Sequence, residues 1–121
     1  MNRIYYTQVT TIGPLALDFF EEKMFILFTS DAPEELMEYC IIHKENRLEG
    51  EIQPGDTFKI GESEYKVTAV GDAVNQNLGA LGHMTVRING SLEADLPGTL
   101  CLEEKAFAGI FEGDCLEIIR F

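Results

Sequence analysis

Basic residues are scarce in this sequence. Nine Lys and Arg stand against 21 Asp and Glu, which gives a formal net charge of −12. Proteins that bind nucleic acid do so largely through Lys and Arg that neutralise phosphates, so this balance argues against a nucleic-acid-binding protein. An anionic membrane surface is disfavoured for the same reason, whereas a protein partner with a basic face would be attracted.

Long apolar runs are also missing. No stretch of 18 or more apolar residues occurs, so no membrane-spanning helix is expected. The first six residues lack the apolar centre of a signal peptide. We therefore predict a cytoplasmic protein that does not insert into the membrane.

Cysteines are few and odd in number. Cys40, Cys101 and Cys115 include no C-x-x-C pair, which predicts buried free thiols and no disulfide framework. The chain also lacks a G-x-S-x-G, a Walker A and a G-x-G-x-x-G motif, and it has no acidic calcium loop. No organic cofactor or calcium site is predicted.

What the chain does contain is a series of short apolar runs separated by turn residues, the pattern of an all-β protein. We expect about eight to ten short strands at the spacing of a single-domain barrel or barrel-like sandwich. No repeat or linker interrupts the series, so one domain over 1–121 is predicted. The expected strands are 4–12, 24–28, 39–44, 47–52, 57–60, 64–70, 83–89, 99–103 and 115–121.

One or two short helices are expected between the strands. The stretch 32–38 has Asp31 upstream, Pro33 at a first-turn position and several acids, which favour a helix start. The stretch 72–82 fits either a short helix or a loop, because its glycines limit its length.

The chain has only two histidines, and histidine is the side chain best suited to chemistry near neutral pH. His43 follows an apolar run close to the point where the sequence turns polar. An imidazole there can leave one nitrogen for an incoming group while a neighbour fixes the other, as phosphoryl transfer requires. From spacing alone, a hydrogen-bonded structural histidine is the more common interpretation.

The second histidine lies in the most regular alternation of the chain. His83, Thr85 and Arg87 should share one strand face, opposite Met84, Val86 and Ile88. An imidazole, a hydroxyl and a cation on one face could hold phosphate oxygens. An ordinary solvated face of an antiparallel sheet explains the same pattern, and from the residues alone we prefer it.

Cys40 and His43 have the C-x-x-H spacing of some zinc sites, and His83 could add a third ligand. On a strand, however, positions 40 and 43 face opposite sides. No metal site is therefore predicted, although a zinc enzyme that uses these three residues stays open as a hypothesis.

Several ordered segments resemble one protein family. The chain is similar to the glucitol/sorbitol-specific IIA component of the bacterial phosphotransferase system, closely over residues 3–100 and loosely beyond. The matching segments begin with the E-Y-C-x-I-H pattern; they are Glu38–His43, Leu48–Gly50, Pro54–Phe58, Tyr65–Gly71, Asn77–Arg87 and Pro97–Thr99, with Ile12–Gly13 and 32–36 upstream.

This resemblance implies a phosphotransferase component that forms a phosphohistidine. A histidine phosphocarrier protein would donate a phosphoryl group, which would pass to the IIB component of the IIB/IIC permease and then to the hexitol. The phosphorylated histidine of the family corresponds to His43, with His83 as a site neighbour. The resemblance also implies an all-β barrel and no metal or organic cofactor.

Two points remain open at this stage. Lys44 and Arg47 follow the histidine and could neutralise a phosphoryl group, or they could simply be solvated. The phosphoryl carrier hypothesis leads us to expect Lys, Arg, a second His or backbone amides near His43. A regulatory or ligand-binding β-barrel that has lost phosphotransfer is the alternative, and the segment 102–113 does not match the family closely.

Overall fold

A computed structural model describes residues 2–121 and contains eight strands and three short helices. The helices are too short to cross a membrane, as far as these residues go. The elements in chain order are β1 (Asn2–Ile12), α1 (Ala16–Glu21), β2 (Met24–Phe28), α2 (Glu34–Met37), β3 (Ile41–Leu48), β4 (Thr57–Ile60), β5 (Ser63–Val70), α3 (Val74–Leu81), β6 (Met84–Ile88), β7 (Thr99–Leu102) and β8 (Cys115–Arg120).

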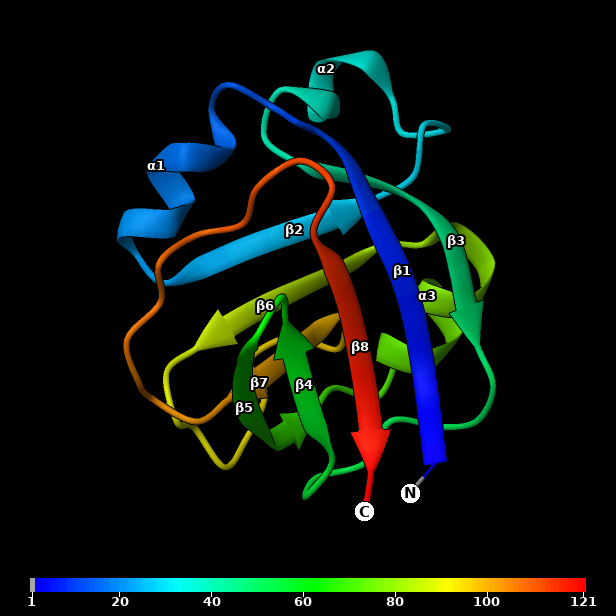
Figure 1. Cartoon of the computed structure of the whole chain (residues 1–121), viewed down its shortest axis with the longest axis vertical. Coiled ribbons are helices and arrows are strands. Elements are labelled where there is room, and N and C mark those ends of the chain that lie inside the picture. Colours follow the sequence, from blue (N-terminus) through cyan, green and yellow to red (C-terminus); the bar gives the residue numbers. More distant parts are fainter. Residues whose placement is uncertain (1) are drawn as a thin grey trace.

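The strands close into a barrel in the order β1-β3-β2-β6-β7-β5-β4-β8. Strand β1 completes the barrel by pairing with β8, so the two ends of the chain lie side by side (Figure 1). Most neighbouring strands are antiparallel, but β2–β3 and β6–β7 are parallel. Closure leaves no sheet edge unpaired. The predicted all-β barrel is confirmed.

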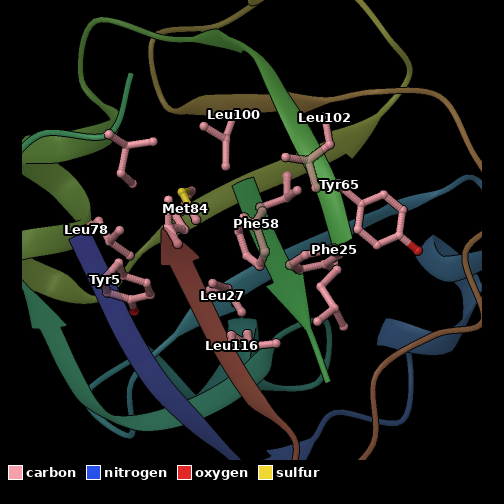
Figure 2. Packing of buried hydrophobic residues seen from close by; sticks show 14 of the residues in the cluster. Tyr5, Phe25, Leu27, Phe58, Tyr65, Leu78, Met84, Leu100, Leu102 and Leu116 are labelled. Atoms are coloured by element: carbon pink, nitrogen blue, oxygen red, sulfur yellow. The ribbon is translucent and has the colours of Figure 1, made fainter. Parts of the chain in front are cut away.

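The barrel interior is filled by side chains that alternate along the strands (Figure 2). On β6, Met84, Val86 and Ile88 are buried, which confirms the predicted alternation. Helix α3 adds Val74 and Leu78 to the same core. A second, smaller cluster lies beside the main one and consists of Phe28, Ala32, Cys40 and Ile42.

The structure corrects the predicted strands over 39–44 and 47–52. A single strand, β3, covers residues 41–48 without a break. Residues 39–40 and 49–52, which were predicted as strand, lie outside it. The polar residues between the two predicted strands form a bulge in which Glu45 and Asn46 have positive φ values of 82° and 41°. The pairing of β3 with β1 shifts at this point, between Tyr6 and Gln8.

The helices also differ from expectation. Helix α1 was not predicted, and no side-chain cap marks its start at Leu15. Helix α2 is a single turn within the predicted stretch 32–38. The ambiguous stretch 72–82 is helical, and Gly82 ends α3 in the left-handed conformation.

Gly13 joins the end of β1 to the segment that leads into β3. Its N–H donates to the Cys40 carbonyl oxygen at 2.9 Å, and the Leu15 N–H donates to the Glu38 carbonyl oxygen at 2.8 Å. A Cβ atom at Gly13 would collide with the backbone carbonyls of Met37 and Glu38. Backbone cannot swing aside as a flexible side chain can, so this contact requires glycine.

We therefore expect Gly13→Ala to lower the free energy of unfolding by about 1–3 kcal/mol, the usual cost of forced overpacking. Urea unfolding followed by circular dichroism measures the loss. Gly98→Ala is the matched control, because its Cβ would meet only the Asn77 side chain at 3.7 Å. Equal stabilities of the two variants would contradict the close packing at Gly13.

Candidate functional site

His43 is buried near the start of β3, with 2% of its surface exposed. It pairs with Val9 on β1, and the following residues Lys44 and Glu45 are exposed. The predicted position at the polar end of an apolar run is therefore correct. The predicted exposure of one ring nitrogen is not found, because both nitrogens have protein partners.

The His43 ring is held from two sides. Its Nδ1 lies 2.6 Å from the Thr7 hydroxyl, and its Nε2 lies 2.8 Å from the carbonyl oxygen of Gly82. A carbonyl oxygen only accepts, so Nε2 carries the hydrogen in this arrangement. In the neutral ring, Nδ1 then accepts from Thr7. Burial lowers the pKa of His43, and the hydrogen bond to Gly82 opposes that shift. The net shift favours the neutral ring.

Thr7 reaches the ring because of the bulge in β3. It lies on β1 where the pairing with β3 shifts, it is fully buried, and its hydroxyl oxygen also contacts the Lys44 carbonyl oxygen. The Asn46 N–H donates to the same hydroxyl oxygen over 3.3 Å. The hydroxyl thus has several partners within the bulge.

Gly82 places its carbonyl against the ring from the end of α3. Its φ of 66° and ψ of 20° are left-handed, which glycine adopts at no steric cost. A Cβ there would lie 3.1 Å from Cε1 and 3.2 Å from Nε2 of His43, and it would also collide with the Thr29 side chain. A glycine is needed here for its backbone conformation and for the close approach.

Asn46 ties α3 to the two strands beside it. Its side chain accepts from the Tyr5 hydroxyl at 2.8 Å and donates to the Leu78 carbonyl oxygen at 2.9 Å. Burial raises the pKa of Tyr5. These contacts fix α3, and with it Gly82, against β1 and β3.

Sequence reasoning missed Thr7, Asn46 and Gly82. The alternation of Tyr5, Thr7 and Val9 on β1 was the available signal for Thr7, since it places a hydroxyl among inward-facing side chains. A buried hydroxyl requires a hydrogen-bond partner, but the sequence alone does not say which one.

His83 directly follows Gly82, whose carbonyl oxygen contacts the His43 ring. Its own ring stacks on Phe28, with ring centroids 4.5 Å apart and planes 17° from parallel. Phe28 pairs with Ile42, the residue before His43. Burial lowers the pKa of His83 as well. His83 is therefore connected to the His43 site through Gly82 and Phe28, while its own ring contacts Phe28.

Thr85 and Arg87 alternate with the buried residues of β6, whereas His83 precedes the first residue of that strand, Met84, and is not part of it as predicted. Strand β6 runs from the side of α3 to the opposite side of the barrel (Figure 1). At about 3.3 Å per residue, Arg87 is about 13 Å from His83. Thr85 is half-buried and Arg87 is exposed. The structure does not bring Arg87 to the His43 ring.

The two other cations near His43 in the sequence point elsewhere. Arg47 pairs with Glu45 at 3.3 Å, and both side chains are well exposed. The Lys44 side chain is exposed, and only its carbonyl takes part in the site. Of the two interpretations left open for these residues, the solvated one fits.

A surface hollow of about 450 Å³ lies next to Gly82. Thr29 and Asn46, which contact Gly82 and α3, belong to its wall, and Leu81 at its rim is 51% exposed. His43 does not line this hollow, but Asn46, three residues farther along β3, does. The hollow is lined by Phe28, Thr29, Asp31, Pro33, Asn46, Ala80 and Leu81.

The zinc hypothesis lacks a ligand set. Across residues 2–121, no three His, Cys, Asp or Glu side chains are grouped in a way that could hold a metal ion. Cys40 instead packs in the small apolar cluster, and burial raises the pKa of its thiol.

Comparisons with known proteins point in one direction. The family model described as "PTS system glucitol/sorbitol-specific IIA component" matches residues 4–117. The glucitol/sorbitol-specific EIIA components of Escherichia coli (strain K12) and Shigella flexneri are each 45% identical over 100 residues, which is 83% of this chain and 81% of theirs.

A solved structure agrees as well. The crystal structure of a PTS system IIA component from Enterococcus faecalis V583 superposes with a TM-score of 0.82 at 27% identity, over 95% of this chain and 99% of that one. The resemblance noted in the sequence is confirmed. With a family model that matches nearly its full length, the chain belongs to the glucitol/sorbitol-specific IIA components of the phosphotransferase system, which are phosphotransferases that act as phosphoryl carriers.

Proposed function

We propose that His43 is the residue that carries the phosphoryl group in this chain. It would accept the group from a histidine phosphocarrier protein and pass it to the IIB component of the glucitol/sorbitol permease. These partners are met in the cytoplasm, and we extend the proposal to that compartment. One observation carries the proposal: the buried His43 imidazole is held in a fixed orientation through both of its ring nitrogens.

Neutrality and orientation are what the reaction requires of the acceptor. A lone pair on a His43 ring nitrogen attacks the phosphorus, and the bond from phosphorus to the donor's ring nitrogen breaks, leaving its electron pair on the donor. Transfer to the next component repeats the step in the other direction. A protonated ring has no lone pair to offer, so burial that lowers the pKa of His43 favours the reactive form.

The charge of the chain supports docking to basic partners. Asp31 belongs to the hollow, and the neighbouring helix α2 carries Glu34 and Glu35 in its first turn. Acids at the rim attract a partner with a basic face and repel acidic surfaces. They also disfavour the phosphoryl group itself, so we expect the partner's cations to compensate its charge during transfer.

We include His83 as a neighbour of the phosphoryl site, because it follows Gly82 and is fixed by stacking on Phe28. Thr85 and Arg87, which we predicted with it, lie farther along β6. We expect the loss of their side chains to slow transfer less than the loss of His83. A barrel that has lost phosphotransfer is the competing hypothesis, and an experiment separates the two.

The chain is expected to become phosphorylated on His43 when it is incubated with phosphoenolpyruvate, enzyme I and the phosphocarrier protein. The phosphate should be labile to acid and stable to alkali, and His43→Asn should abolish it because the acceptor nitrogens are gone. Mass spectrometry and acid treatment check both points.

His83→Asn is the control for that experiment, and it should still accept phosphate, though more slowly. Wild-type labelling of the His43→Asn variant would rule out His43 as the carrier. Absence of labelling in the unmodified chain would favour the barrel without phosphotransfer.

The pKa of His43 should lie below the ordinary value of 6.5, because burial disfavours the charged ring. The folded state then binds fewer protons than the unfolded state, so the stability from this residue is lost as the pH falls below 6.5. Proton NMR of the two Cε1–H signals over pH 4–8 measures the midpoint. His83→Asn assigns the signals, and a midpoint at or above 6.5 would contradict the expectation.

A further inference from the structure

The Thr7 hydroxyl has one hydrogen to donate but faces two acceptors. One is Nδ1 of His43 at 2.6 Å, and the other is the carbonyl oxygen of Lys44. The Asn46 N–H approaches the hydroxyl oxygen from a third direction, as a donor. Thr7 can therefore either donate to the ring or accept from it, and only when it accepts from the ring is its hydrogen available to the Lys44 carbonyl oxygen.

Each choice corresponds to one neutral form of the ring. When Nε2 carries the hydrogen, it donates to Gly82, and Thr7 donates to Nδ1. When Nδ1 carries the hydrogen, it donates to Thr7, and Thr7 donates to Lys44. The second form leaves a lone pair on Nε2, which the Gly82 carbonyl oxygen would repel. That form therefore requires the Gly82 carbonyl to turn away.

The two nitrogens also differ in what covers them. Nδ1 faces Thr7, which is fully buried within the β1–β3 ladder, so no phosphoryl group fits between them. Nε2 is covered by the carbonyl of a left-handed glycine at the end of α3, close to the surface hollow. A glycine peptide can rotate with little steric penalty. Rotation of the Gly82 peptide would therefore uncover Nε2.

We propose that Thr7 is a positioning residue: by accepting from Nδ1–H it stabilises the neutral form of His43 whose lone pair lies on Nε2, and so makes Nε2 the acceptor. To reach that form, Nδ1 takes up a proton from water, and Nε2 releases its proton to water once the Gly82 carbonyl has turned away. This inference rests on the proposed role of His43. As the lone pair of Nε2 forms its bond to phosphorus, the bond from phosphorus to the donor's nitrogen breaks and the donor keeps that pair. Nδ1 retains its hydrogen, and Thr7 stabilises the positive charge that develops on the ring by accepting from it.

Thr7→Val and Thr7→Ser test this role. Valine has nearly the same shape as threonine but neither donates nor accepts, so the rate constant of His43 phosphorylation should fall about 10- to 100-fold, the usual effect of losing a group that orients a reactive histidine. Serine retains the hydroxyl and should stay within a few-fold of the unmodified chain. Rapid-quench labelling from the phosphorylated phosphocarrier protein measures the rates.

Long-range ¹H–¹⁵N NMR gives a readout that a merely structural role would not change. At rest the ring should carry its hydrogen on Nε2, and in the phosphorylated chain the phosphorus should sit on Nε2 with the hydrogen on Nδ1. These spectra are recorded on the unmodified chain, so they decide the question even if Thr7→Val fails to fold. Phosphorus on Nδ1, or hydrogen on Nδ1 at rest, would overturn the inference.

The two proposals fail in different ways. If Thr7→Val folds and is phosphorylated at the rate of the unmodified chain, then Thr7 has no positioning role, while His43 remains the carrier. If instead the His43→Asn variant is labelled normally, the carrier itself is misassigned. A slow Thr7→Val together with a fast Thr7→Ser supports the inference.

Discussion

The His43 ring depends on two hydrogen bonds from groups that are far apart in the chain. The Thr7 hydroxyl comes from β1, and the Gly82 carbonyl comes from the end of α3. A buried polar ring that lacks such partners costs a few kcal/mol, so these bonds are a condition for placing an imidazole in the barrel wall. The bulge at Glu45 and Asn46 and the left-handed turn at Gly82 both serve that condition.

The same enclosure shapes the chemistry. No Lys or Arg side chain from the described part of the chain bonds to the ring, and its only partners there are neutral groups. A site of this kind supplies a neutral nucleophile but little compensation for phosphoryl charge. On the proposed function, the barrel contributes the oriented acceptor, and a basic partner contributes the compensating charge. This sharing of roles between the barrel and its partner suits a carrier that must pass the phosphoryl group on to the next protein.

The sequence predicted most strands and the barrel, but it did not predict helix α1 or the bulge in β3. The strands follow from period-2 alternation, as in Met84, Val86 and Ile88, and closure of the barrel was anticipated as one of two architectures. Helix α1 was missed because it lacks a capping side chain. The polar run after His43 led to two predicted strands instead of one, because polar residues occur both between strands and in bulges, and only the pairing with β1 distinguishes the two cases.

The site was predictable in part. Family resemblance, rather than spacing, singled out His43, and it lies in a position suited to the role proposed for it. Thr7 and Gly82 could not be assigned, since their contact with the ring depends on the register of β1 against β3 and on where α3 ends. Alternation correctly separated Thr85 and Arg87 from the buried Met84, Val86 and Ile88 on β6, but it carries no information about their distance from another strand.

Closure of the barrel by β1 and β8 has a consequence for how the protein is made. Asn2 pairs with Arg120, so the ladder that seals the barrel joins residues separated by almost the whole described chain. Contacts of such high sequence separation form slowly, because a long loop must close first. During synthesis, β1 has no β8 to pair with until Cys115–Arg120 has been made. Until then both β1 and β4 present open edges, which expose the nascent chain to aggregation.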